Sequence, residues 1–347
     1  MTNQTRTMII VWLAVCCALV FTMVLLGGAV RLTGSGLSMV DWKPIMGVFP
    51  PLSEIAWTRV FEQYQQFPEF KIVNAQISLE KFKFIYLMEY THRILGRLIG
   101  LVFSLPFIYF VSSKKLSSAL MPNLGAKLWL LFAMGVIQGG VGWYMVKSGL
   151  VDNPRVSPYR LVLHLLIAVI IYAYMIRILT GLLPMWRIHP PRAQKLGIAV
   201  VGVILLMIAS GGFVAGTHAG FIYNTFPTMG GEWIPTEIGA LTPMWLNLFE
   251  NPVAIQFAHR ALAMLVLSLV VIYALMLIGG NQKVHGVLIG IGLLIAVVFQ
   301  VSLGIVTLVS GVPPVLGVAH QAGALILLTI AVISVSLPAL INDDTGA

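Results

Sequence analysis

Eight apolar runs, each long enough to cross a lipid bilayer, constrain the fold of this chain more than any other feature. They lie near residues 8–30, 84–112, 126–147, 159–182, 196–217, 253–279, 285–310 and 316–340. A helix needs about 20 apolar residues to span the hydrocarbon core. Only 10% of the 347 residues are charged, against about 25% in a soluble domain. The sequence therefore predicts an all-α polytopic membrane protein with eight transmembrane helices.

The distribution of charge predicts how these helices are oriented. The formal net charge is +9, but the basic residues are not gathered on one face, so we expect no nucleic-acid partner. If the N-terminus is cytoplasmic, the inner side carries the basic residues Arg6, Lys114, Lys115, Lys127, Arg177, Arg187, Arg192, Lys195 and Lys283. Its only acidic residues are Asp343 and Asp344. The positive-inside rule therefore predicts that both termini are cytoplasmic.

Two connections on the outer side, 31–83 and 218–252, are long and rich in aromatic residues, Pro and Gly. Loops of this length usually carry a function or fold over something, so we expect both to cap the outer mouth of the bundle. The adjacent Cys16 and Cys17 lie inside the first apolar run, where thiols usually act as small packing groups. No C-x-x-C pair occurs in a loop, so the sequence supports neither a disulfide framework nor a thiol relay.

The second half of the chain repeats the first. The first apolar run ends LLGGAVRLTGSG and the fifth ends ASGGFVAGTHAG, and a long outer loop follows each. EYTHR in the second run corresponds to QFAHR in the sixth. IQGGVGWYMVKSG in the third run corresponds to FQVSLGIVTLVSG in the seventh. RLVLHLLIA in the fourth run corresponds to GVAHQAGA in the eighth. We therefore predict two tandem four-helix halves, 1–190 and 191–347, which run in the same direction about a pseudo-two-fold axis along the membrane normal.

Four histidines occupy matching positions near the outer ends of the even-numbered helices: His92, His164, His259 and His320. A single membrane histidine usually makes a hydrogen bond between helices, but two matched pairs favour metal ligation. Two imidazoles per site do not suit structural zinc, which takes four protein ligands, and do suit the axial positions of haem iron in a four-helix bundle. One turn after the histidines stand small residues that would leave room for a macrocycle: Gly96, Ala168, Ala263 and Ala324. We expect two haems, one in each half.

The halves differ three residues before the first histidine of each pair, where Glu89 corresponds to Gln256. Glu89 could form an ion pair with Arg93 one turn later, or it could point at the edge of one macrocycle and stabilise charge that develops there. Guanidinium groups near the outer ends suit haem propionates, although interface snorkelling explains any single one equally well. These groups belong to Arg31, Arg93, Arg97 and Arg260. We expect His218, in AGTHAG, to be a loop residue that makes a hydrogen bond and not a fifth ligand.

At these residues the chain resembles the haem A synthase family. The resemblance rests on GGAVRLTGSGLSMVDWKP, EYTHRILGRLIG, AGTHAGFIYNTFPTMGG, QFAHRALA and GVAHQAGA, which span nearly the whole chain in order. It implies the family's duplicated eight-helix fold. It also implies the family's reaction, in which a ring methyl of haem O is oxidised to the formyl group of haem A, for terminal oxidases, by successive hydroxylation and loss of water.

The resemblance assigns the substrate to the N-terminal half. There His92 and His164 would be the axial ligands of the substrate haem iron, with Arg93 and Arg97 as further binding residues. Glu89, in the E-x-x-H-R motif, would be the catalytic residue beside the reacting methyl. Expected partners are haem O, the lipid bilayer, the haem O synthase and an electron acceptor. The sequence leaves a homo-oligomeric state open.

In the C-terminal half, His259 and His320 would be the axial ligands of a haem b cofactor, with Arg260 beside it. Some family members carry a cysteine pair in outer loops, and this chain resembles the branch without that pair. The N-terminus shows neither a cleavage site nor an Arg/Ser-rich transit peptide, so we expect a retained first helix in a bacterial cytoplasmic membrane. The alternative function is a quinol-linked di-haem b electron carrier, in which neither haem changes. A third class, a haem transporter, should not need matched pairs in both halves.

Overall fold

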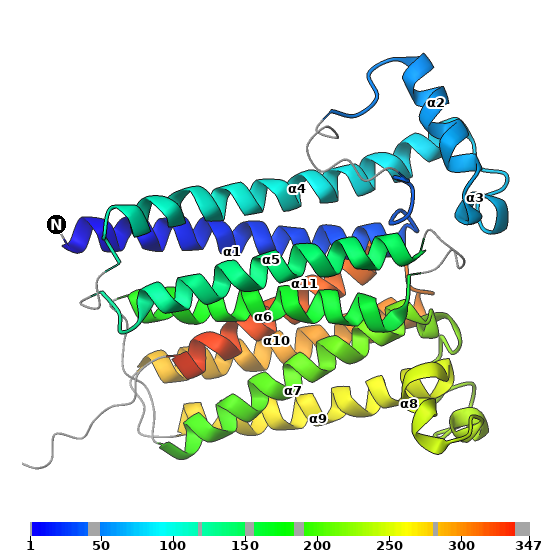
Figure 1. The fold of residues 1–347 in the computed structure, drawn as a ribbon. Helices are drawn as coiled ribbons and strands as arrows, with labels where there is room; N and C mark the ends of the chain where they lie inside the picture. The colour runs from blue at the N-terminus through cyan, green and yellow to red at the C-terminus, as the bar shows by residue number, and fades with distance from the viewer. Residues whose placement is uncertain are drawn as a thin grey trace, which may run out of the picture.

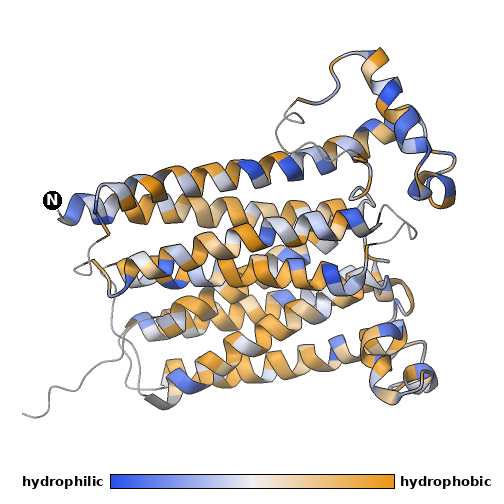
Figure 2. Cartoon of the chain, viewed as in Figure 1, coloured by the Kyte–Doolittle hydropathy of each residue, from blue (hydrophilic) through white to orange (hydrophobic). Residues whose placement is uncertain are grey.

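The computed structural model describes residues 2–40, 49–116, 120–149, 156–183, 191–279 and 284–336. Within these ranges, eight helices are long and apolar enough to cross a membrane. They are α1 (Thr2–Leu32), α4 (Leu79–Ser112), α5 (Leu124–Gly149), α6 (Pro158–Leu182), α7 (Pro191–Gly216), α9 (Pro252–Gly279), α10 (Val284–Val309) and α11 (Pro314–Ser336). The helices form one bundle (Figure 1), and apolar residues cover most of their length (Figure 2). The predicted all-α membrane fold with eight spans is confirmed.

The predicted spans coincide with these helices apart from a few residues at their ends. One extension is in α4, which begins at Leu79 because the Ser78 hydroxyl accepts a hydrogen bond from Lys81 N (3.2 Å) and so caps the helix. Residues 337–340 of the last predicted span lie outside the described residues. So do four of the charged residues on which the predicted orientation rests, namely Arg187, Lys283, Asp343 and Asp344.

The first long connection packs on the end of α4 that projects beyond the other helices (Figure 1). It contains α2 (Glu54–Gln65) and α3 (Pro68–Ile72). A cluster of buried apolar residues joins them to α4: Met39, Tyr64, Phe82, Ile85 and Tyr86. The described part of this connection therefore covers the projecting end of α4, which is a narrower cap than we expected. Residues 41–48 lie outside the described residues.

The second long connection packs over the ends of α7 and α9. It forms η1 (Ala219–Phe221), η2 (Thr236–Gly239), η3 (Met244–Leu246) and α8 (Asn247–Glu250). Asn247 Nδ2 donates to Leu241 O (2.8 Å), and Asn224 Nδ2 donates to Leu308 O (2.9 Å) and ties the loop to α10. We call the end of the bundle that carries α2, α3 and this loop the capped end. The helices α4, α6, α9 and α11 all begin there (Figure 1).

The principal helix contacts are the same in the two halves. Each contact has a counterpart when α1, α4, α5 and α6 are matched in that order with α7, α9, α10 and α11. Between the two sets, α6 packs against α11, and the contact of α1 with α11 corresponds to that of α7 with α6. One pair of contacts differs in extent. α9 packs closely along α10, whereas α4 contacts α5 far less, with Phe107 packing on Trp129 and Phe132. Cys16 and Cys17 are buried in the core of the bundle, as expected of packing groups.

The helices α1 and α7 end in the same way at the capped end. The hydroxyls of Thr33 and Thr217 each donate to the carbonyl oxygen one turn earlier (2.8 Å in both cases). The next residue, Gly34 in one case and His218 in the other, has a left-handed backbone with φ of +64° and +57°. A left-handed residue ends a helix and turns the chain away from its axis. The chain therefore leaves α1 and α7 with the same local geometry.

Candidate haem sites

The four predicted ligands lie on α4, α6, α9 and α11, toward the capped end. His164, His259 and His320 lie within the first two turns of their helices, and His92 lies further along because α4 projects beyond the bundle. His92 lies near His164, and His259 lies near His320. The structure therefore brings the predicted histidines together as one pair in each half.

The second histidine of each pair lies against a glycine of the preceding helix. A methyl group placed on Gly142 of α5 would lie 2.8 Å from Cε1 of His164. One placed on Gly304 of α10 would lie 2.7 Å from Cε1 of His320. Both distances are shorter than real methyl contacts, so any larger residue would displace the ring. These glycines let the backbone approach each imidazole closely.

A glutamine one turn before that glycine contacts the same histidine. Gln138 Nε2 donates to His164 O (3.0 Å), and Gln300 Nε2 donates to His320 O (3.0 Å). Each amide also approaches the ring, at 3.5 Å from His164 Nε2 and 3.1 Å from His320 Nδ1. The two glutamines were not among the residues predicted from the sequence, although their segments align. Their shared Q-x-x-x-G spacing was the signal, because residues four apart lie on one helix face.

The first histidine of each pair also faces a glycine. A methyl group on Gly27 of α1 would lie 3.2 Å from His92 Nε2, and one on Gly211 of α7 would lie 3.4 Å from His259 Cε1. Gly27 and Gly211 hold the same place in the aligned segments LLGGAVRLTGSG and ASGGFVAGTHAG. All four imidazoles thus lie beside a backbone position that carries no side chain.

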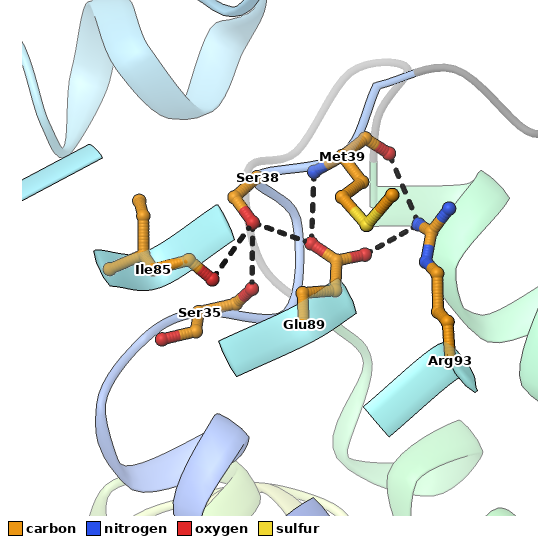
Figure 3. Close-up of polar contacts among 6 residues, drawn as sticks. All are labelled: Ser35, Ser38, Met39, Ile85, Glu89 and Arg93. Carbon is orange, nitrogen blue, oxygen red and sulfur yellow. Dashed lines mark hydrogen bonds and ion pairs between the residues drawn. The ribbon is translucent and has the colours of Figure 1, made fainter. Parts of the chain in front are cut away.

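Glu89 is buried, with 3% of its surface exposed, and binds the loop that follows α1 (Figure 3). Its Oε2 accepts hydrogen bonds from Ser38 Oγ (2.7 Å) and Met39 N (2.9 Å). Its Oε1 pairs with Arg93 Nη2 at 2.5 Å, and the same guanidinium donates to Met39 O (3.1 Å). The ion pair that the sequence analysis considered is therefore present. The contacts to Ser38 and Met39 could not be anticipated, because they join segments about fifty residues apart.

The second half makes the corresponding contacts without a carboxylate. Gln256 Nε2 donates to Tyr223 O (2.9 Å), and Arg260 Nη2 donates to the same oxygen (3.0 Å). Arg260 Nη1 also donates to Thr228 O (3.3 Å). Tyr223 aligns with Met39 when the two GG motifs are superposed. In both halves, the residues three before and one after the histidine bind the preceding loop to the helix of the histidine: the loop after α1 to α4, and the loop after α7 to α9.

Two other arginines were candidates for haem propionates. Arg31 donates to Ala215 O (2.7 Å) and Gly216 O (3.3 Å), and its guanidinium lies 3.1 Å from His218 Nε2. A cation there satisfies terminal carbonyl groups of α7 and complements the helix dipole. The expected hydrogen bond of His218 is thus present, with an arginine from the first half as its partner. Arg97 lies one turn beyond Arg93 on α4 and is half-buried.

A second buried carboxyl group, which was not predicted from the sequence, lies in α3. Glu69 is 7% exposed, and among the described residues its Oε2 has no hydrogen-bond partner. Burial raises the pKa of this carboxyl group to about 7, a hydrogen bond with Tyr64 lowers the pKa, and the nearby Glu89 carboxylate raises it. Only the packing of α2 and α3 onto α4 creates this environment.

The residues around each histidine pair fit a haem. No group of three or more His, Cys, Asp or Glu side chains in the described part of the chain could hold a metal ion. Two imidazoles therefore suit an iron whose other ligands come from a macrocycle. Five buried polar atoms around the two pairs have no hydrogen-bond partner among the described residues: His164 Nδ1, Gln138 Oε1, Gln300 Oε1, Gln256 Oε1 and Arg260 Nε. The N–H group at Nε of Arg260 is a suitable hydrogen-bond donor to a haem propionate.

Comparison with known proteins places the chain in a family. The sequence model of the cytochrome oxidase assembly protein family (COX15-CtaA) matches residues 10–332. Heme A synthase of Nitrosospira multiformis is 47% identical over 337 residues, covering 93% of this chain and 91% of the relative. Heme A synthase of Nitrosomonas eutropha is 44% identical over 335 residues, covering 95% and 93%. The enzyme of that name from Rhodospirillum centenum is 47% identical over 326 residues, covering 91% and 84%. This chain therefore belongs to the cytochrome oxidase assembly protein family.

Proposed function

We propose that this membrane protein is a haem A synthase, an oxidoreductase that converts haem O to haem A. The observation that carries the proposal is the pair of half-buried histidines in each half, each beside a glycine, in a chain that aligns with haem A synthases over more than nine-tenths of its length. The reaction oxidises a ring methyl of haem O to a formyl group by successive hydroxylation and loss of water.

In this proposal the chain is a tandem duplication, 1–190 and 191–347, with a different haem in each half. Haem O as substrate would lie between His92 and His164, and haem b as cofactor between His259 and His320. The matched contacts of the two halves support the duplication. When bound, haem b supplies a one-electron redox centre close to the substrate half. Arg260, with its buried Nε, would bind a propionate of haem b.

Glu89 is the residue that we propose for the chemistry in the N-terminal half. It is a buried carboxylate on the helix of His92, three residues before it, and the C-terminal half has the neutral Gln256 there. A carboxylate can stabilise positive charge that develops on a substrate or accept a proton from it. Because Ser38, Met39 and Arg93 occupy both carboxylate oxygens, Glu89 would exchange one of these contacts to act on the substrate.

The two halves suggest a substitution that separates catalysis from loop binding. Glu89→Gln gives the N-terminal half the residue that already binds the equivalent loop in the C-terminal half. We expect the haem content to persist and haem A formation to fall by about 100-fold or more, as when one electrostatic stabiliser is removed. Glu62→Gln on α2 is the control, because the Glu62 carboxyl group is exposed, and it should leave conversion unchanged. Wild-type haem A formation by Glu89→Gln would show that Glu89 only binds the loop.

The proposed reaction is tested by extracting the pigments of protein made with and without a supply of haem O. We expect haem b together with haem O or a hydroxylated derivative when haem O is supplied. Haem b alone under both conditions would refute the substrate and favour the di-haem b electron carrier.

We also propose that the protein lies in a bacterial cytoplasmic membrane with both termini cytoplasmic, so that the capped end is outermost. The excess of basic residues on the opposite side supports this orientation. A reporter fused to the C-terminus that is active only in the cytoplasm tests it, and activity only of a periplasmic reporter would reverse the orientation.

A further inference from the structure

One hydroxyl group distinguishes the surroundings of the first histidine in each pair. Ser210 Oγ of α7 lies 3.1 Å from His259 Nδ1, within hydrogen-bond distance. The residue aligned with Ser210 on α1 is Leu26, directly before the GG motif in both helices. Among the described residues, the ring of His92 has no hydrogen-bond partner. The second histidines show no such difference in residue type, because each has a glutamine beside it.

We infer that Ser210 is a positioning residue that holds His259 in the orientation of a permanent haem ligand, whereas Leu26 leaves His92 able to release its haem. This inference rests on the proposed function, since it concerns the two haems assigned above. A cofactor has to stay through many turnovers, but a substrate haem has to enter and leave. The histidine that binds the cofactor should therefore be held more firmly than the histidine that binds the substrate.

The chemistry of imidazole supports a holding role for Ser210. A neutral imidazole carries one proton, so when Nε2 binds iron the proton is on Nδ1. The serine oxygen has lone pairs that can accept that N–H. Such a contact fixes both the tautomer and the orientation of the ring and makes the ligand more basic. A leucine side chain cannot accept a hydrogen bond, so at His92 only packing opposes rotation of the ring.

Gly211 makes this hydrogen bond possible. A methyl group on Gly211 would lie 3.4 Å from His259 Cε1, at the limit of ordinary contact, so the ring lies close against the α7 backbone. The hydroxyl of the adjacent Ser210 can therefore reach Nδ1. At the matching place on α1, a methyl group on Gly27 would lie 3.2 Å from His92 Nε2, but the adjacent Leu26 offers only apolar atoms.

The test measures how fast haem b leaves the purified full-length protein in detergent when excess apomyoglobin traps the released haem. Loss of a partner that orients a metal ligand usually lowers affinity by about 10–100-fold, so we expect Ser210→Ala to release haem b faster by that factor. Ser210→Thr, which keeps the hydroxyl, should restore the wild-type rate. Ser268→Ala on α9 is the control, because the Ser268 hydroxyl is exposed and donates to Met264 O (2.9 Å).

Two further measurements separate positioning from a general loss of stability. A less basic ligand stabilises ferric iron less, so the reduction potential of haem b should rise in Ser210→Ala and return in Ser210→Thr. Leu26→Ser should slow the release of haem O from the N-terminal half. Unchanged release and an unchanged potential in Ser210→Ala would overturn the inference.

Variants of His259 separate the role of Ser210 from the proposed cofactor site. If His259→Ala removes haem b while Ser210→Ala behaves as wild type, the ligand assignment stands and the role of Ser210 fails. If His259→Ala keeps full haem b, the proposed cofactor site itself fails. If Ser210→Ala cannot be purified, the rate of haem O release from Leu26→Ser is the test. An unchanged rate would refute the inference.

Discussion

The close approach of Gly304 to His320 allows a substitution that should disturb one of the two proposed haem sites and little else. In Gly304→Ala, the new methyl group would lie 2.7 Å from Cε1 of the His320 ring. Ordinary contact begins at 3.4 Å, so the ring has to move away by about 0.7 Å, because repulsion rises steeply at shorter distances. The helix itself should not be harmed, since Ala is favoured over Gly in a helix by about 1 kcal/mol.

The displacement of the ring sets the magnitude of the effect. Functional groups in a site have to be held to within about 0.5 Å of their productive geometry, which a shift of about 0.7 Å exceeds. Disturbing the orientation of a metal ligand costs about 10–100-fold in affinity, or about 1.4–2.7 kcal/mol. We therefore expect Gly304→Ala to bind haem b about 10–100-fold more weakly.

The assay is a titration of the purified, haem-depleted protein with haem b, followed by its absorption spectrum. Gly292→Ala on the same helix is the matched control, because its methyl group would meet only Ile330, at 4.0 Å. Gly142→Ala should weaken binding of haem O in the same way and leave haem b in place. Wild-type affinity of Gly304→Ala for haem b would refute the reasoning, since the ring would then either not be displaced or not be a ligand.

Three further predictions concern groups at the capped end. The pKa of Glu69 is raised from 4.5 to about 7 in the folded protein. Protonation of Glu69 therefore stabilises the folded state; this stabilisation is complete below pH 4.5 and is lost as the pH rises through about 7. Hydrogen exchange of α2 and α3 should therefore show on the order of 2–3 kcal/mol less stability at pH 8 than at pH 5, and an equal pH dependence in Glu69→Gln would contradict this. Arg31→Gln should lower the unfolding free energy by about 1–2 kcal/mol, because it removes a cation from the end of α7; an unchanged melting temperature in detergent would show that the contact contributes nothing. Arg260→Gln should weaken retention of haem b and loosen the loop at Tyr223, and wild-type haem content and exchange rates would exclude both roles.

The sequence by itself determined the number and place of the transmembrane helices, because the thickness of a bilayer sets the length of each apolar run. It also identified the matching histidines, since ionisable side chains are rare enough inside a membrane for four of them to stand out. The ion pair between Glu89 and Arg93 followed from their spacing, because residues four apart share one face of a helix. All of these inferences depend on local spacing.

Only the tertiary structure decided which groups meet between helices. Three sets of contacts join segments far apart in the chain. Ser210 contacts His259, Arg31 contacts the end of α7, and Glu89 binds Ser38 and Met39. They depend on how each helix is rotated about its axis. In a bilayer both the lipid and the protein core are apolar, so the pattern of apolar residues does not reveal which face turns inward. The rotation of each helix follows from packing, and packing placed a glycine beside every candidate ligand.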